Sequence, residues 1–301
     1  MALIVMGTVA LDNLKTPSGE KRGLLGGSAS HFSMSASLFT KVAIAGVVGK
    51  DFPKKYMIFL KAKGVDVSSI QIEEGKTFQW DGEYKKENFN AAITHATEIG
   101  VLCNYQPSIS EAQYNISNVF LGNIDPVSQD KFLSLMKSPK FVGLDSMNLW
   151  IHTQKTALLK LIKKVDLFVA NDKEAQDITG ENNLILAAKA LAALGPKFIV
   201  IKKGEHGVLF YSKQFMCGFP AYPVEKVVDP TGAGDTFAGG LMGFLSAAKK
   251  INETSIRQAL VYATICSSFN VEGFAMDKTA KLTLADVKIR RAKYLAFAKV
   301  A

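Results

Sequence analysis

One run of residues in the last third of the chain has side-chain types and a spacing suited to anion chemistry. Gly232 and Gly234 flank Ala233, and Asp235 follows them at the start of a segment that favours a helix. Glycine has no side chain to keep a ligand away from the backbone. The unpaired N–H groups of a helix start attract an anion. We therefore expect the amides of this run to form an anion site.

Asp235 needs a separate explanation, because a carboxylate beside an anion site repels the ligand. Its presence makes sense if it accepts the proton of a hydroxyl group that attacks a bound phosphate. The simpler alternative is an aspartate that caps the helix. Two other known phosphate-binding motifs do not match this sequence. Phe237 stands where a dinucleotide fingerprint has its third Gly or Ala, and residues 46–51 lack the spacing and the Ser or Thr of a Walker loop.

The sequence DPTGAGDTF, from Asp229 to Phe237, closely resembles the C-terminal motif of the PfkB (ribokinase-like) carbohydrate and nucleoside kinases. Gly26 and Gly27 resemble the family's first motif, so the resemblance covers most of the chain. It implies an ATP-dependent kinase that phosphorylates a hydroxymethyl group of a sugar or nucleoside, with ATP and Mg²⁺ as cofactors. In that reaction Asp235 is the general base, and the glycine-rich run is the anion hole.

Two further segments resemble parts of the family's nucleotide site. Asn171 and Glu174 match an Asn-x-x-Glu motif that helps to hold Mg²⁺ and the phosphates, with the glutamate acting through water. A helix N-cap with an acidic first turn explains the same two residues. Lys202, Gly204 and Gly207 match a Lys-x-Gly-x-x-Gly nucleotide loop, for which a glycine-containing hairpin turn is the alternative.

Thr231 and Asn270 complete the ATP site that the resemblance implies. Thr231 belongs to the glycine-rich run. Asn270 lies one helical turn after Ser267 and two after Ala263, on a helix that packs beside adenine in the family. Close packing of small residues between helices explains this spacing equally well.

Five positions are the candidates for binding the acceptor substrate: Asp12, Gly26, Gly27, His31 and Asn123. In the family, an aspartate at the place of Asp12 binds sugar hydroxyls, and Gly26 with Gly27 forms the hinge between the core and a lid. Asn123 follows a predicted strand at the edge where the other candidates lie. Together they predict a site for a small-molecule sugar or nucleoside.

His31 departs from the family pattern. The common pattern has an asparagine at this position, four residues after the glycine pair, and that asparagine holds the sugar. An imidazole and an amide present different donors and acceptors. The resemblance therefore does not carry a ribokinase-like or fructokinase-like specificity, and two alternatives remain: His31 contacts the acceptor, or it packs near Phe32.

These residues must be positioned by regular elements, and apolar runs of strand length alternate with longer helix-period stretches. This alternation predicts right-handed βαβ units and a doubly wound, mostly parallel sheet. Ligands bind beyond the carboxyl ends of such strands. Strands are expected at 3–6, 42–48, 119–121, 141–144, 167–170, 198–201 and 208–211, and helices at 29–39, 52–63, 127–137, 153–164, 183–194, 234–248, 253–270 and 284–299.

A second, smaller sheet is expected outside the main one. Phe78, Trp80 and Tyr84 alternate with polar residues, as in a half-exposed strand, and a similar short strand is expected through residues 101–105. An edge hairpin is the alternative to a lid that excludes water from the site. The resemblance favours the lid, built from segments 12–27 and 75–106, and it often serves as a dimer contact in the family. An exposed Trp80 would fit a homodimer.

The lid aromatic residues leave the acceptor class open. Phe78, Trp80 and Phe89 either stack on a nucleoside base or form the apolar face of the lid itself. The sequence alone does not choose among ribose-like sugars, hexoses, sugar phosphates and nucleosides.

Composition limits the class of protein. The chain has 301 residues, of which 48% are hydrophobic and 21% charged, and this fits one globular kinase domain spanning residues 1–301. No apolar run reaches membrane-spanning length, so we expect a cytoplasmic protein without a membrane partner. The net charge of +9 suggests nucleic-acid binding at first. However, the lysines lie along solvated helix faces without interleaved aromatic residues, so we expect no nucleic-acid partner.

A non-catalytic sensor derived from the same fold is the main rival to a kinase. Such a sensor binds a nucleotide or sugar without turnover and has no need of a base. The intact Asp235 therefore favours the enzyme.

Overall fold

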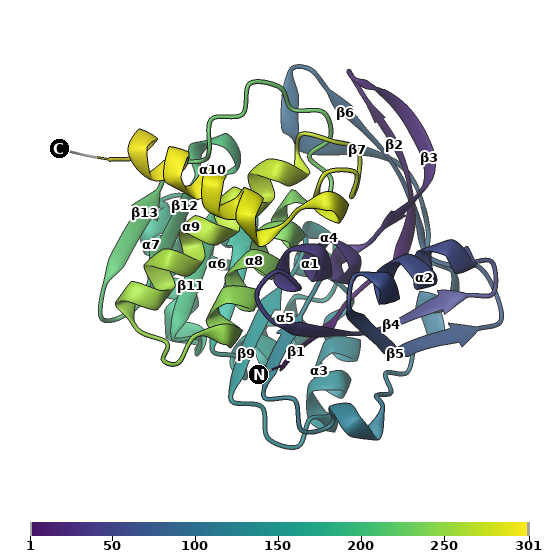
Figure 1. Cartoon of the computed structure of the whole chain (residues 1–301). Coiled ribbons are helices and arrows are strands. Elements are labelled where there is room, and N and C mark those ends of the chain that lie inside the picture. Colours follow the sequence, from purple (N-terminus) through teal and green to yellow (C-terminus); the bar gives the residue numbers. More distant parts are fainter. Residues whose placement is uncertain (1, 300–301) are drawn as a thin grey trace.

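The computed structural model describes residues 2–299, and its main layer is a nine-stranded, mostly parallel sheet (Figure 1). Among the described residues of this main sheet, only the pairs at one edge, β11 with β12 and β12 with β13, are antiparallel. The order across the sheet is β13 (Met216–Phe219), β12 (Val208–Tyr211), β11 (Phe198–Lys202), β10 (Leu167–Asn171), β9 (Phe141–Asp145), β8 (Asn118–Leu121), β1 (Ala2–Met6), β4 (Lys41–Gly49) and β5 (Val65–Glu73).

Helices cover both faces of this sheet, as the alternation predicts (Figure 1). One face packs against α1 (Ser28–Ala36), α2 (Lys54–Ala62), α8 (Ala233–Ala247) and α9 (Glu253–Asn270). The other packs against α3 (Pro126–Leu135), α4 (Asn148–Thr153), α5 (Lys155–Ile162), α6 (Asp172–Thr179) and α7 (Leu184–Leu194). The last helix, α10 (Leu284–Phe297), packs on α9. Within residues 2–299, none of the helices has the length and apolar character needed to cross a membrane.

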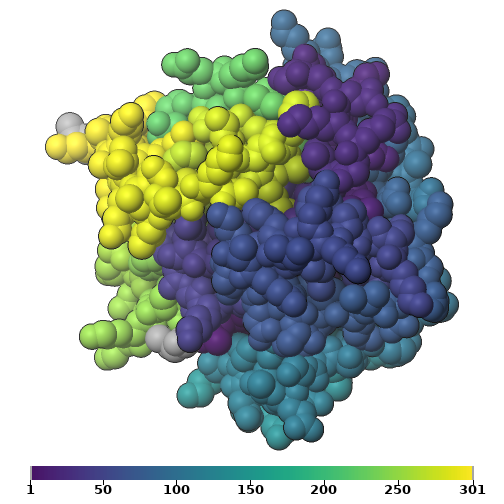
Figure 2. Space-filling model, turned by 45° about the vertical axis from the view of Figure 1, so that its right-hand side comes forward, coloured from purple at the N-terminus to yellow at the C-terminus, as the bar shows by residue number. Residues whose placement is uncertain are grey.

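The expected second sheet is present and has four strands. Its order is β3 (Gly19–Gly26), β2 (Ala10–Thr16), β6 (Gln79–Lys85) and β7 (Asn88–Glu98). In Figure 2 its purple strands lie against the yellow C-terminal segment, where Lys21 pairs with Asp277 at 2.9 Å. Trp80 is half-buried in an apolar cluster with Leu14 and Phe274, so it is not the exposed residue that the homodimer expectation used.

The strand predicted through residues 101–105 is wrong. This segment is a 3-10 helix, Gly100–Asn104. Gly100 takes a φ of +52°, which turns the chain away from β7. Val101 and Tyr105 are then both buried in the core beneath the main sheet, one helical turn apart. The period that looked like a strand is therefore the spacing of a single turn.

Candidate active site

Polar side chains gather where three neighbouring strands of the main sheet end. Lys202 ends β11, Asn171 ends β10 and Asp145 ends β9. The Nζ atom of Lys202 donates to Oδ2 of Asp145 at 2.9 Å, and the Asp145 side chain is only 5% exposed. A Cβ placed on Gly234 would lie 3.0 Å from the same Nζ. The structure therefore brings the predicted lysine directly beside the glycine-rich run.

The glycine-rich run is a loop that leads into α8. Gly232 is the N-cap residue with a left-handed φ of +71°, and no side chain among the described residues caps this helix. The amide of Ala233 donates to the Pro230 carbonyl at 3.1 Å, inside the loop. The Ala233 amide is therefore already paired within the loop, and the next amide along the chain is that of Gly234.

A buried polar network supports this loop from behind. Asn270 is fully buried, and its Nδ2 donates to the Thr231 carbonyl at 2.7 Å. Its Oδ1 accepts from the Thr236 hydroxyl at 3.0 Å and from Nδ1 of His31 at 3.2 Å. The His31 ring packs against Gly232 so closely that a Cβ there would lie 2.2 Å from its Cγ. Both side chains therefore hold the loop in place.

This placement bears on two expectations. Asn270 is expected to contact ATP, and in the structure its side-chain amide is buried and hydrogen-bonded to the glycine-rich loop and to Thr236. His31 is 1% exposed and lies against the loop, which favours the packing alternative over contact with the acceptor. Burial lowers the pKa of His31 to about 4, so the imidazole is neutral near pH 7 and donates from Nδ1.

Asp235 lies in the first turn of α8 and is partly exposed. Burial raises the pKa of its carboxyl group to about 7; the charge of Asp145 raises it further, and that of Lys202 lowers it. The carboxylate therefore faces the ion pair at the strand ends and is not turned into packed protein. A pKa near neutral is suited to a group that accepts a proton at physiological pH.

Asp12, at the start of the lid, lies close to Asp229 and Asp235. Asp12 is 4% exposed and accepts a hydrogen bond from the Gly27 amide, and a Cβ on Gly26 would fall on its carboxylate. Burial raises the pKa of Asp12 to about 8, with Asp229 and Asp235 adding to the rise. The glycine pair is thus the backbone against which Asp12 fits.

Tyr84 of β6 is a site residue that the sequence did not assign. Burial raises its pKa above the ordinary range, and the charges of Asp229, Asp12 and Asp235 add to the rise. Its hydroxyl therefore lies among these carboxylates, beside Thr231. Sequence did contain a signal, because Tyr84 alternates along the lid strand in phase with Trp80, and Trp80 pairs in register with Asp12.

The Asp12→Asn variant gives a first prediction, on stability. A folded pKa of about 8 lies above the ordinary 3.8, so ionisation destabilises the folded protein as pH rises through that interval. Asparagine resembles the protonated carboxyl group. Thermal unfolding should show the variant melting at a higher temperature than the wild type above about pH 8, with the difference vanishing near pH 4. A difference that does not change with pH would contradict this titration.

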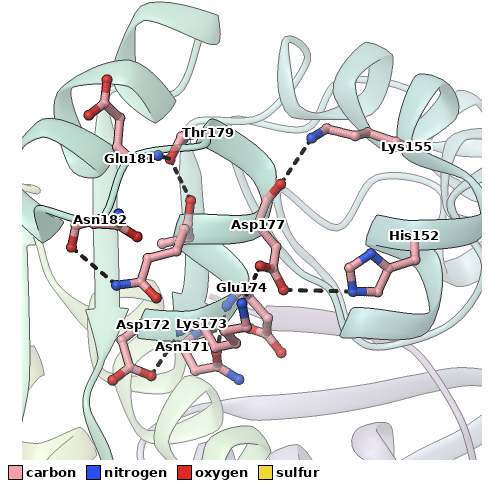
Figure 3. Close-up of polar contacts among 12 residues, drawn as sticks. His152, Lys155, Asn171, Asp172, Lys173, Glu174, Asp177, Thr179, Glu181 and Asn182 are labelled. Atoms are coloured by element: carbon pink, nitrogen blue, oxygen red, sulfur yellow. Dashed lines mark hydrogen bonds and ion pairs between the residues drawn. The ribbon is translucent and has the colours of Figure 1, made fainter.

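Asn171 and Glu174 form a capping box at the start of α6 (Figure 3). The Glu174 amide donates to Oδ1 of Asn171 at 2.8 Å, and the Asn171 amide donates to Oε2 of Glu174 at 2.7 Å. Glu174 is nevertheless close to the site. Burial raises its pKa to about 8; Lys202 lowers that value, and Asp145 and Asp235 raise it. Glu174 therefore caps the helix and also lies close to Lys202, Asp145 and Asp235.

A cavity of about 470 Å³ opens beside the glycine-rich loop. Lys202, Gly204, Gly207 and Gly234 line it together with the apolar segment 220–224 and residues of α9. Three of the residues predicted to bind ATP thus line the same cavity as the glycine-rich loop. Two lid residues from β7, which the sequence did not place here, also line it: Phe89 and Asn90.

Asn123 lies apart from this cavity, after β8. Its Oδ1 accepts a hydrogen bond from Nε1 of Trp150 at 2.9 Å, and its carbonyl accepts one from the Ser28 hydroxyl at 3.1 Å. Ser28 follows the glycine pair, so Asn123 sits near the predicted hinge. Trp150 was not predicted, and no motif marks it in the sequence.

The donor set for a metal ion is small. Within residues 2–299 no group of three or more His, Cys, Asp or Glu side chains is arranged to hold an ion. Three carboxyl groups, those of Asp145, Glu174 and Asp235, nevertheless interact around the single cation of Lys202. These carboxyl oxygens are donors of the kind that suits a hydrated Mg²⁺ bound mainly through water and phosphate.

Comparison with known proteins gives matches over nearly the whole chain. The model of the pfkB family carbohydrate kinases matches residues 12–276. The cytidine kinase of Thermococcus kodakarensis is 33% identical over 258 residues, which make up 83% of this chain and 91% of that protein.

Solved structures match the same architecture. The nucleoside kinase of Burkholderia thailandensis in complex with inosine gives a TM-score of 0.80 at 18% identity, covering 99% of this chain and 100% of that one. The fructokinase of Vibrio cholerae, in its fructose, ADP and calcium ion bound form, gives 0.79 at 18% identity, covering 99% of each chain. At such identities these structures bear on the fold, and the expected ribokinase-like architecture with its lid is confirmed.

Proposed function

The chain belongs to the pfkB family of carbohydrate kinases, and we propose that it transfers the γ-phosphoryl group of ATP to a hydroxymethyl group of a nucleoside or sugar. One observation carries this proposal. The loop that leads to Asp235 lines the cavity that Lys202 also lines, and the charge of Asp235 acts on Asp12 of the lid. A nucleotide bound in the cavity and an alcohol bound at Asp12 would meet at the loop.

Each side chain has a role in this mechanism. Asp12 binds hydroxyl groups of the acceptor. Asp235 takes the proton from the acceptor hydroxyl that attacks. The oxygen forms its bond to the γ-phosphorus while the bond to the β-phosphate oxygen breaks, and ADP leaves. The Gly234 amide and Lys202 stabilise the charge on the phosphoryl oxygens, because preorganised donors favour the transition state. The released proton stays on Asp235 until solvent removes it.

Mg²⁺ would be held at the phosphate end, with Glu174 bound to its water shell. When bound, it would neutralise charge on the ATP phosphates. Asn171 positions Glu174 for this contact through the capping box.

The acceptor is tested with a panel of nucleosides and sugars. Because a cytidine kinase is 33% identical to this chain, cytidine comes first, followed by inosine, ribose and fructose. ADP formation that depends on one of these acceptors supports the kinase. Tight binding of ATP and an acceptor without turnover would instead favour the non-catalytic sensor.

The pH dependence of the rate gives a second prediction. The base must be ionised, and the pKa of Asp235 is raised to about 7. We expect kcat/KM for the acceptor to rise about tenfold per pH unit below this value and to level off above it. The residual rate of an Asp235→Asn variant should lack this rise. A wild-type profile that is already flat well below pH 7 would contradict the assignment.

A further inference from the structure

The hairpin formed by β6 and β7 reaches from the acceptor side of the molecule to the nucleotide cavity. Phe89 and Asn90, near the start of β7, line that cavity together with Gly204 and Glu205 of the nucleotide loop. The two segments are far apart in the sequence. A part of the lid therefore forms a wall of the cavity proposed for ATP.

The contact between lid and loop is specific. Nδ2 of Asn90 donates to Oε2 of Glu205 at 2.5 Å. Gly204 has a φ of +53°, and a Cβ at this position would lie 2.4 Å from Oδ1 of Asn90. The loop therefore accommodates the asparagine because it has no side chain there. The backbone N–H of Asn90 donates to Oδ1 of Asn88 at 2.9 Å, which orders the hairpin at the contact.

The same hairpin also carries the acceptor-side lid residue. β6 and β7 are paired from Gln79 with Glu98 to Lys85 with Asn88. Tyr84, one residue before that last pair, lies among the carboxylates of Asp12 and Asp235. One two-stranded segment thus reaches both proposed substrate sites.

We propose that Phe89 and Asn90 are nucleotide-binding residues supplied by the lid, and that the contact of Asn90 with Glu205 couples the binding of a nucleoside triphosphate to closure of the lid. This inference rests on the proposed function, because it assigns the cavity to a nucleotide. A nucleotide in the cavity contacts Phe89 and Asn90 only when the lid is closed, so its binding favours the closed lid. By reciprocity, whatever closes the lid must then strengthen nucleotide binding by the same factor.

The test uses AMP-PNP with Mg²⁺ as the probe, and the full chain. Calorimetry measures its affinity, and hydrogen exchange measures protection of residues 84–94. In the wild type, AMP-PNP should slow exchange in this hairpin. In Asn90→Ala we expect roughly fivefold or more weaker binding and loss of that protection, because one charge-assisted hydrogen bond is removed.

A double-mutant cycle separates this contact from general damage to the lid. Glu205→Ala should also weaken binding, and the double variant should bind no more weakly than Asn90→Ala, because all three variants lose the contact between Asn90 and Glu205. Lys86→Ala, on the exposed turn of the same hairpin, is the matched control and should bind as the wild type does. Equal affinity and protection in wild type and Asn90→Ala, or losses that simply add in the double variant, would overturn the inference.

Failure of the inference is distinguishable from failure of the proposed function. If the wild type turns over ATP with an acceptor but Asn90→Ala binds AMP-PNP equally well, only the lid contact is wrong. If the wild type binds AMP-PNP but phosphorylates no acceptor, the kinase proposal fails while the lid contact is still tested. If AMP-PNP does not bind at all, both are overturned.

Discussion

An Asp235→Asn variant should fold, bind an ATP analogue, and lose at least about a hundredfold in kcat, because removal of a general base costs on the order of 10²–10⁴ in rate. Its melting temperature should not fall, since the carboxylate it replaces is destabilised by burial, as the raised pKa of about 7 indicates. Steady-state ADP formation, AMP-PNP titration and thermal unfolding measure the three properties.

Asp286→Asn is the matched control for this variant. Both residues are acids in the first turn of a helix, but Asp286 is exposed and serves as the N-terminal cap partner of Thr283 in α10. If Asp235 did no more than stabilise the start of its helix, the two variants would behave alike. Turnover within a few-fold of the wild type in folded Asp235→Asn protein would remove its role as the base.

A Gly232→Ala variant should also lose about a hundredfold or more in kcat, the typical effect of disturbing an oxyanion site. Alanine at a φ of +71° is strained, and its Cβ would fall 2.2 Å from the buried His31 ring. That ring is buried and hydrogen-bonded to Asn270, and both features resist its displacement. The loop must shift instead, and the Gly234 amide shifts with it. Single-turnover kinetics with saturating ATP and acceptor measure the loss.

Gly180→Ala isolates the backbone part of this effect. Gly180 has a similar φ of +78° at the end of α6, but within residues 2–299 no heavy atom beyond its immediate chain neighbours lies within 4 Å of a Cβ placed there. Its replacement should cost about 1–2 kcal/mol in the free energy of unfolding, from backbone strain alone, and leave kcat unchanged. If Gly232→Ala showed no more than this loss of stability with normal turnover, the loop would not be the anion site.

The parallel strands of the main sheet could be predicted because they are buried on both faces. β1 and β8, for example, are almost wholly buried and appear in the sequence as short apolar runs. Most of β7 and the first half of β3 are exposed instead, so neither shows the alternation that marks a half-buried strand. Their place in the lid sheet is set by pairing with β6 and β2, which a local pattern does not contain.

The candidate site likewise contains residues that a local sequence pattern could predict and residues whose positions depend on tertiary packing. Asp235 and the glycine-rich loop were predicted because their chemistry lies within one contiguous motif, and Lys202 and Asn171 because each ends a strand. The true position of His31 depends on how α1 packs against α8, and that of Asn270 on how α9 packs against α8. Neither packing is visible in a local pattern. Asn90 lines the cavity proposed for the nucleotide because β7 pairs with β6 in the lid sheet.

The structure of a ternary complex with AMP-PNP, Mg²⁺ and the acceptor identified in the panel would test the central claim most directly. We predict that a carboxylate oxygen of Asp235 lies about 2.6–3.2 Å from the reacting hydroxyl of the acceptor, with the γ-phosphate against the Gly234 amide. An acceptor hydroxyl held out of reach of Asp235, or a γ-phosphate bound away from the glycine-rich loop, would contradict it.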